Sequence, residues 1–144
     1  MAYKGRYKPN SPEKYIGNPT NVIYRSLLER RFMVYCDTSK NILEWGSEEV
    51  VVPYKSPVDN RMHRYYVDFI VRLKNKEGLT ETILIEVKPK RQCSPPKKST
   101  KKRKAYITEM KTWGVNTAKW KAATEYAENK GWKFKIMTDE TLAP

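Results

Sequence analysis

Two β-strand patterns joined by a turn constrain the fold of this chain most. Residues 61–73, RMHRYYVDFIVRL, alternate between two sets of side chains, as a strand with two distinct faces does. A second β-rich run, TILIEVKPK, follows at residues 82–90. If the two form a hairpin with its turn centred near Glu77, Asp68 lies directly opposite Glu86. A turn shifted by one position would change that pairing.

The flanking patterns predict helices on both sides of the hairpin. A helix is expected over residues 21–37, with Thr20 or Asn21 as its N-cap. Further strands are expected at 42–45, 49–54 and 132–138, and a helical pattern broken near Gly114 at about 101–113 and 117–130. The chain is therefore predicted to be an α/β domain with a mixed central β-sheet flanked by helices.

The organisation along the chain is simple. Residues 1–20 are rich in Pro and Gly and predict a basic N-terminal arm, whose tyrosines could anchor it to the body or stack on a base. Residues 21–144 predict a single domain, because 144 residues usually make only one. Within it, residues 89–104 predict an irregular basic loop.

The net charge of the chain limits the kinds of molecule that it is expected to bind. The chain holds 29 Lys+Arg against 16 Asp+Glu, a formal net charge of +13, which favours nucleic acid over an anionic membrane surface. No apolar run is long enough for a membrane span, and no basic amphipathic helix accompanies the charge, so no membrane is expected as a partner. Eight loop residues are expected to contact the DNA backbone: Lys90, Arg91, Lys97, Lys98, Lys101, Lys102, Arg103 and Lys104.

The small number of cysteines and histidines excludes several kinds of metal and catalytic site. Cys36 and Cys93 form no CxxC pair, which argues against a disulfide scaffold or a zinc ribbon and favours a reducing compartment. His63 is the only histidine, so zinc proteases and other sites that need two or more histidines are excluded.

The hairpin itself places groups suited to phosphodiester hydrolysis on one face of a sheet. Asp68 and Glu86 would repel each other unless a divalent cation lay between them, and hard oxygen ligands suit Mg²⁺, or Mn²⁺ in its place. Lys88 shares the face of Glu86 and could position or activate the attacking water. Glu29, from the helix upstream, could supply a third carboxylate. The plainer alternatives are a solvent-side ion pair for Glu86 and Lys88 and a helix-surface partner for Glu29.

These residues resemble the motif of the PD-(D/E)xK nuclease superfamily, with Asp68, Glu86, Lys88 and Glu29 at the matching positions. The Pro that often precedes the Asp is replaced by Val67. YRSLLE at 24–29 is similar to the transposon-end endonuclease branch. WGSE, RYYVD, IEVKPK and TWGVNTAKWKAA extend the similarity over nearly the whole chain, to the head completion nucleases of T-even-like tailed bacteriophages.

The resemblance implies a restriction-endonuclease-like core and a DNA nuclease, endo- or exonucleolytic, that acts on packaged DNA before the tail joins the head. Asp68, Glu86 and the Val87 carbonyl would then hold the metal. The expected partners are double-stranded DNA, without sequence specificity, and head or portal and neck proteins. The expected location is the host cytoplasm during assembly, with association with the virion as an alternative.

Two rival functions stay open at this stage. A non-catalytic protein that binds DNA ends or the portal could keep the acidic residues for structure alone. An RNA-binding module is disfavoured, because the chain has neither an RNP nor a KH signature.

Overall fold

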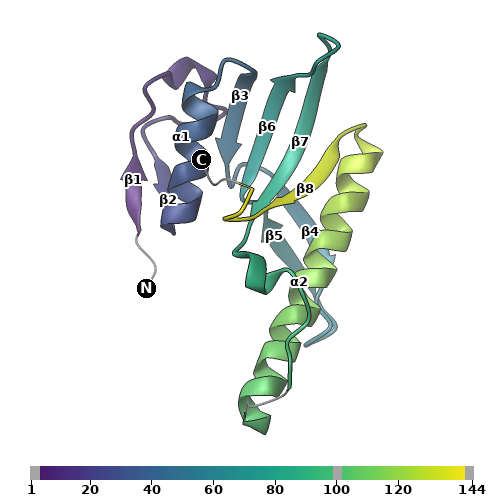
Figure 1. Ribbon diagram of the computed structural model, residues 1–144. Coiled ribbons are helices and arrows are strands. Elements are labelled where there is room, and N and C mark those ends of the chain that lie inside the picture. Colours follow the sequence, from purple (N-terminus) through teal and green to yellow (C-terminus); the bar gives the residue numbers. More distant parts are fainter. Residues whose placement is uncertain (1–3, 99–101, 142–144) are drawn as a thin grey trace.

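The computed structural model describes residues 4–98 and 102–141, which fold around a four-stranded mixed sheet with strand order β3-β6-β7-β8 (Figure 1). The strands are β1 (Gly5–Tyr7), β2 (Val22–Tyr24), β3 (Ile42–Ser47), β4 (Val51–Lys55), β5 (Met62–Tyr66), β6 (Phe69–Lys74), β7 (Thr80–Val87) and β8 (Lys133–Met137). The helices are η1 (Pro12–Lys14), α1 (Leu27–Thr38), η2 (Lys90–Gln92) and α2 (Arg103–Asn129). β8 runs parallel to β7 and the other pairs of this sheet are antiparallel, so the predicted α/β class with a mixed sheet is confirmed.

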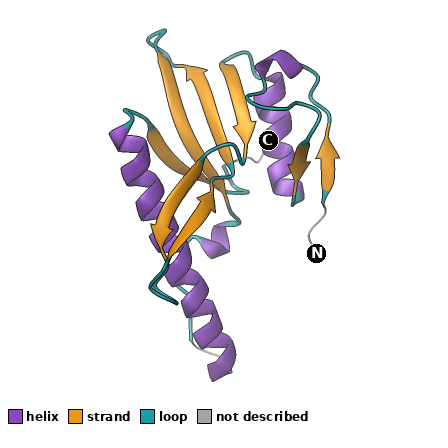
Figure 2. Cartoon of the chain, turned by 180° about the vertical axis from the view of Figure 1, so that it is seen from behind, coloured by secondary structure: helices purple, strands orange, loops and turns teal. Residues whose placement is uncertain are grey.

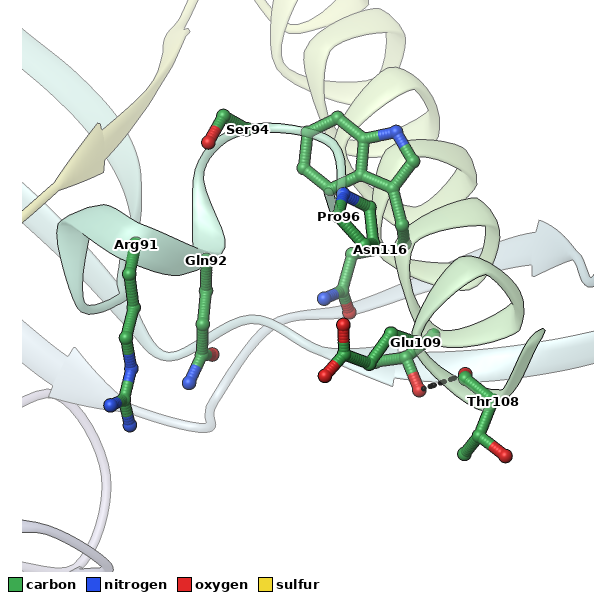
Figure 3. Close-up of a pocket in the computed structure, with 9 residues that line it drawn as sticks. Arg91, Gln92, Ser94, Pro96, Thr108, Glu109 and Asn116 are labelled. Carbon is green, nitrogen blue, oxygen red and sulfur yellow. Dashed lines mark hydrogen bonds between the residues drawn. The ribbon is translucent and has the colours of Figure 1, made fainter. Parts of the chain in front are cut away.

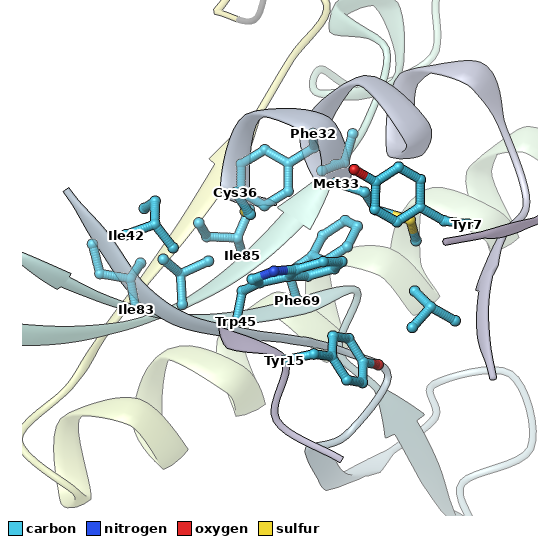
Figure 4. Close-up of a cluster of buried hydrophobic side chains, with 13 residues drawn as sticks. Tyr7, Tyr15, Phe32, Met33, Cys36, Ile42, Trp45, Phe69, Ile83 and Ile85 are labelled. Carbon is cyan, nitrogen blue, oxygen red and sulfur yellow. The ribbon is translucent and has the colours of Figure 1, made fainter. Parts of the chain in front are cut away.

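The two long helices cover opposite faces of the central sheet. On one face, α1 packs on a cluster that includes Trp45, Phe69 and Ile85 (Figure 4). On the other face, Ile70 and Leu84 contact the apolar side of α2 and the β4–β5 hairpin, which is seen in front of the sheet in Figure 2. Alternating residues of β6 and β7 therefore enter different cores, as the period of two requires.

The register of the central hairpin agrees with the sequence pattern. Phe69 pairs with Ile85 and Val71 with Ile83, and the same register carries Asp68 opposite Glu86. The turn contains Gly78 at a positive φ of 78°, a conformation that favours glycine. The predicted pairing of the hairpin is thus confirmed.

The single strand predicted over 61–73 is wrong. The chain leaves one sheet after Tyr66 and enters the next at Phe69, so β5 pairs with β4 in a separate two-stranded sheet. Asp68 lies at this junction, where its backbone carbonyl accepts a hydrogen bond from the Glu48 N–H. The alternation of faces does not continue across the junction, because the two halves belong to different sheets.

The helix predicted over 21–37 is also shorter than expected. Val22–Tyr24 forms β2, which pairs with β1, and α1 begins only after Ser26. The Ser26 hydroxyl accepts the Glu29 N–H at 3.1 Å, so Ser26 and not Thr20 or Asn21 is the N-cap. The β-branched and aromatic residues of β2 pair with the N-terminal segment instead.

The predicted break at Gly114 is wrong as well. α2 runs without interruption from Arg103 to Asn129, because a glycine within a helix costs only about 1 kcal/mol and the turn after Gly114 packs into the second core through Val115 and Ala118. Gly131, at a φ of 75°, follows the helix as expected of a C-terminal glycine. The loop predicted over 89–104 is shortened at both ends, since η2 begins at Lys90 and α2 at Arg103.

The described part of the N-terminal segment is tied to the body. Tyr7 and Tyr15 are buried, and the Tyr15 ring meets Trp45 edge-on with 4.8 Å between centroids. Asp37 accepts hydrogen bonds from the Tyr7 hydroxyl and from the N–H groups of Asn10 and Ser11, at 2.7–2.9 Å. Tyr7 and Tyr15 therefore anchor the segment, whereas Tyr3 lies outside the described residues.

Candidate active site

Asp68 and Glu86 face each other where β6 begins and β7 ends. The Val87 N–H donates to Asp68 Oδ2 at 2.8 Å, which holds the Asp68 carboxyl against the last residues of β7. Burial, followed by the charge of Glu86, raises the pKa of Asp68 well above its usual range. A pair held this closely shares a proton or needs a cation.

Glu86 is fixed in place by two donors. Only 4% of Glu86 is exposed, and the Tyr65 hydroxyl donates to its Oε1 at 2.9 Å. The indole N–H of Trp120 donates to Oε2, also at 2.9 Å, and Lys88 Nζ lies 3.9 Å from the same oxygen. Each carboxylate oxygen carries two lone pairs, so both oxygens can still accept a further ligand.

The sequence pattern did not identify Tyr65 and Trp120 as parts of this site. In one continuous strand Tyr65 would face away from Asp68, but the junction between β5 and β6 turns it toward Glu86. Trp120 belongs to α2, which is far from Glu86 in sequence. The contact that brings it to Glu86 depends on how α2 crosses the sheet, for which the chain carries no local signal.

Glu29 lies at the first turn of α1 and is half-buried. Its carboxylate accepts hydrogen bonds from the Arg25 N–H at 3.2 Å and from the Ser26 hydroxyl at 3.4 Å. Burial, with the Glu48 charge adding to it, raises the pKa of Glu29, and the Glu29 charge in turn contributes to the raised pKa of Asp68. Glu29 is therefore near Asp68, yet it also caps its own helix. Glu48 is paired with the Arg25 guanidinium at 3.0 Å.

Substitutions at Glu29 should separate its capping role from a catalytic one. Glutamine also serves at the third position of a capping box. The free energy of unfolding of Glu29→Gln should therefore lie within about 0.5 kcal/mol of that of the native chain. Glu29→Ala should lose about 0.5–2 kcal/mol. Thermal melting checks both values. If Glu29 takes part in cleavage, Glu29→Gln slows the reaction despite its normal stability, whereas a purely capping residue leaves the rate unchanged.

The predicted DNA-contacting residues do not form one loop. Lys97 and Lys98 are exposed in the coil after η2, Lys102 is the N-cap of α2, and Arg103 and Lys104 lie in its first turn. Arg91 is exposed in η2, and Lys101 lies outside the described residues.

Lys90 and His63 already have partners within the chain. Lys90 Nζ is paired with Glu140 at 3.0 Å, so it is engaged within the chain. His63 is paired with Asp59 at 2.8 Å beside the Tyr54 ring, on the β4–β5 hairpin. None of the hydrogen bonds or ion pairs of His63 in the described residues involves Asp68 or Glu86.

The donor set at this site fits a hard divalent cation. Among the described residues, no cluster of three or more histidine, cysteine or acidic side chains has an arrangement that could hold a metal. Asp68 and Glu86 alone provide side-chain oxygens, and Mg²⁺ typically uses only one or two carboxylates, with water and substrate phosphate as its other ligands. The raised pKa of Asp68 supports the fit, because a cation would relieve the repulsion between the Asp68 and Glu86 carboxylates.

No helix among residues 4–98 and 102–141 is both long and apolar enough to cross a bilayer. This finding agrees with the absence of any long apolar run in the sequence.

Comparison with known proteins gives two matches. A model of the family described as TnsA-like endonuclease N terminal matches residues 39–139, a stretch that contains Asp68, Glu86 and Lys88. The head completion nuclease of Enterobacteria phage T4 is 39% identical over 146 aligned residues, which cover 99% of this chain and 95% of that protein. The chain therefore belongs to the TnsA-like endonuclease family and, within it, groups with the head completion nucleases of tailed phages.

Proposed function

We propose that this nuclease hydrolyses DNA phosphodiester bonds in a reaction that requires Mg²⁺, or Mn²⁺ in its place, during completion of a phage head. The observation that supports the metal requirement is the facing pair of Asp68 and Glu86, where burial and then the Glu86 charge raise the pKa of Asp68. The role in head completion rests on the match to the T4 protein over 99% of this chain.

Each residue of the site has a separate role in the proposed reaction. Asp68 and Glu86, with the Val87 carbonyl, would hold the cation, which supplies positive charge to acidify water and to neutralise the phosphate. Tyr65 and Trp120 keep the Glu86 carboxylate in one orientation through their two hydrogen bonds. Lys88 positions the attacking water and stabilises the negative charge that develops on the phosphate oxygens. Glu29 assists from the start of α1.

DNA would reach these carboxylates over the basic surface that follows β7. Lys97, Lys98 and Lys102 are exposed and can neutralise phosphates without reading bases, so binding should not depend on sequence. Portal or neck proteins are proposed as partners in the assembling head, in the host cytoplasm and with association with the virion as an alternative location.

A cleavage assay tests the proposal directly. Purified protein is incubated with linear and with circular DNA in Mg²⁺, in Mn²⁺ and in EDTA. Cleavage should require the metal, and Lys88→Ala should slow it by about a hundredfold, the loss typical of a removed charge-stabilising group. Lys135→Ala changes an exposed lysine on the neighbouring strand β8 and should leave the rate unchanged.

The rival function makes the opposite prediction in the same assay. A non-catalytic protein that binds DNA ends would bind both substrates but cleave neither in any divalent metal. That result would overturn the proposed nuclease activity. Linear and circular substrates also separate exonucleolytic from endonucleolytic cleavage, because only the latter opens the circle.

A further inference from the structure

A pocket of about 530 Å³ lies beside the candidate active site, between the segment after β7 and the N-terminal half of α2. Arg91 and Gln92 of η2 extend from one side, and Glu109 and Asn116 extend from α2 on the other (Figure 3). Pro96 and Trp113 form an apolar part of the pocket wall. Its volume falls in the range of roughly 300–1,000 Å³ that is common for small-ligand pockets.

Asn116 is the residue that points to a ligand. Only 9% of Asn116 is exposed, and it lines the pocket. No hydrogen bond joins its side-chain amide to any other group in the described part of the chain. Its amide atoms are open to the pocket and not sealed from water, and they offer two donors and an acceptor that a ligand could satisfy.

The pocket is connected to the catalytic carboxylates through two indoles in contact. The Trp113 ring meets Trp120 edge-on, with 5.7 Å between the centroids, and Trp120 donates to Glu86 at 2.9 Å. On the other side, η2 begins two residues after Lys88. A group seated in this pocket would therefore lie close to a phosphate held at Glu86 and Lys88.

The wall chemistry favours a nucleobase over a phosphate. An indole ring and a proline offer a stacking surface, and the amides of Asn116 and Gln92 match the donor and acceptor edge of a base. Arg91 can hold the backbone next to the base. A base exposes this edge to a pocket only when it is unpaired.

We infer that this pocket binds an unpaired nucleobase of the DNA strand that is cut, so that the enzyme favours ends or junctions that carry single-stranded nucleotides. This inference rests on the proposed nuclease function and adds to it a preference for substrate structure.

Equilibrium binding in EDTA tests the inference without any need for cleavage. Fluorescence anisotropy compares a blunt duplex, the same duplex with a single-stranded extension, and the same duplex with an abasic extension that keeps the phosphates but lacks the bases. The extension with bases should bind about tenfold more tightly than the blunt end, and the abasic one should lose most of that gain.

Variants then test whether the tighter binding of the extension with bases comes from the pocket. Asn116→Leu fills the site with an apolar side chain, and Trp113→Ala removes the stacking surface, so both should abolish the preference and leave binding of the blunt duplex unchanged. Asn129→Leu, at the exposed end of the same helix, and Trp132→Phe, at its far end, are the matched controls and should retain the preference. Should Trp113→Ala fail to fold, Asn116→Leu alone decides.

The outcomes of the two proposals can be distinguished. Equal binding of the normal and abasic extensions, or a full preference in Asn116→Leu, overturns the pocket and leaves the proposed cleavage untouched. A preference that Asn116→Leu abolishes, in a protein that cleaves nothing in any metal, supports the pocket and overturns the nuclease.

Discussion

Glu86→Gln is expected to reduce DNA cleavage by about a hundredfold to a thousandfold while leaving the fold intact. The substitution removes the negative charge but not the hydrogen-bonding capacity of the side chain. The amide oxygen can accept from the Trp120 indole, which is only a donor, and the amide NH₂ can donate to the Tyr65 hydroxyl, which can also accept. Stability should therefore not fall, and it should rise somewhat because Glu86 loses the charge that opposes ionised Asp68, so lost cleavage reports on the charge and not on the fold.

Two further variants make this result specific. Glu86→Ala leaves the Tyr65 hydroxyl and the Trp120 N–H without a partner, and each buried unpaired group costs about 1–3 kcal/mol, so this variant should also melt earlier. Glu81→Gln neutralises another acid of β7, which is paired with Lys133 at 2.9 Å, and should cleave normally. Steady-state cleavage and thermal melting measure both effects. Normal cleavage by Glu86→Gln would mean that this carboxylate is structural.

The central hairpin and its carboxylates could be predicted from sequence because their pattern is local. The alternation in β6 and β7 and the turn at Gly78 determine which residues are opposed, and this places Asp68 against Glu86. Lys88 follows Glu86 by two positions and shares its face for the same reason.

The partners of these carboxylates could not be predicted in this way, because they depend on tertiary packing. Tyr65 reaches Glu86 only because the chain changes sheets between β5 and β6, and Val67 and Asp68 give no signal of that change. Trp120 reaches Glu86 from a helix whose crossing of the sheet is set by the second core. The start of α1 at Ser26 was readable from the Ser26 and Glu29 capping box, but the apolar run before it obscured that signal.

Asp68→Asn is expected to stabilise the protein and to abolish cleavage. In the native chain, burial and the Glu86 charge raise the pKa of Asp68, which means that its ionised form opposes folding. An asparagine can still accept the Val87 N–H through its carbonyl oxygen and can donate to Glu86 through its amide. Each unit by which the pKa is raised corresponds to about 1.4 kcal/mol, or roughly 3–5 °C in Tm for a chain of this size.

The stabilisation should depend on pH in a definite direction. The folded state holds the Asp68 proton at a higher pH than the unfolded state, so the native chain loses stability as pH rises from about 4 through the raised pKa. The advantage of Asp68→Asn should thus be absent below about pH 4, grow as pH rises, and then level off. Melting curves across pH check this. Asp139→Asn is the control. The Lys90 N–H lowers the pKa of Asp139, so removal of the Asp139 charge should not stabilise the protein.

A divalent cation should reduce the difference in melting temperature between Asp68→Asn and the native chain at neutral pH. If Mg²⁺ binds between the two carboxylates, it stabilises the native chain by mass action and has less effect on Asp68→Asn, which offers one charge fewer. Melting curves with and without Mg²⁺ measure this effect independently of cleavage. An Asp68→Asn protein that melts at or below the native temperature at pH 8 would show that the facing carboxylates impose no cost on the fold. The electrostatic argument for a cation at this site would then fail.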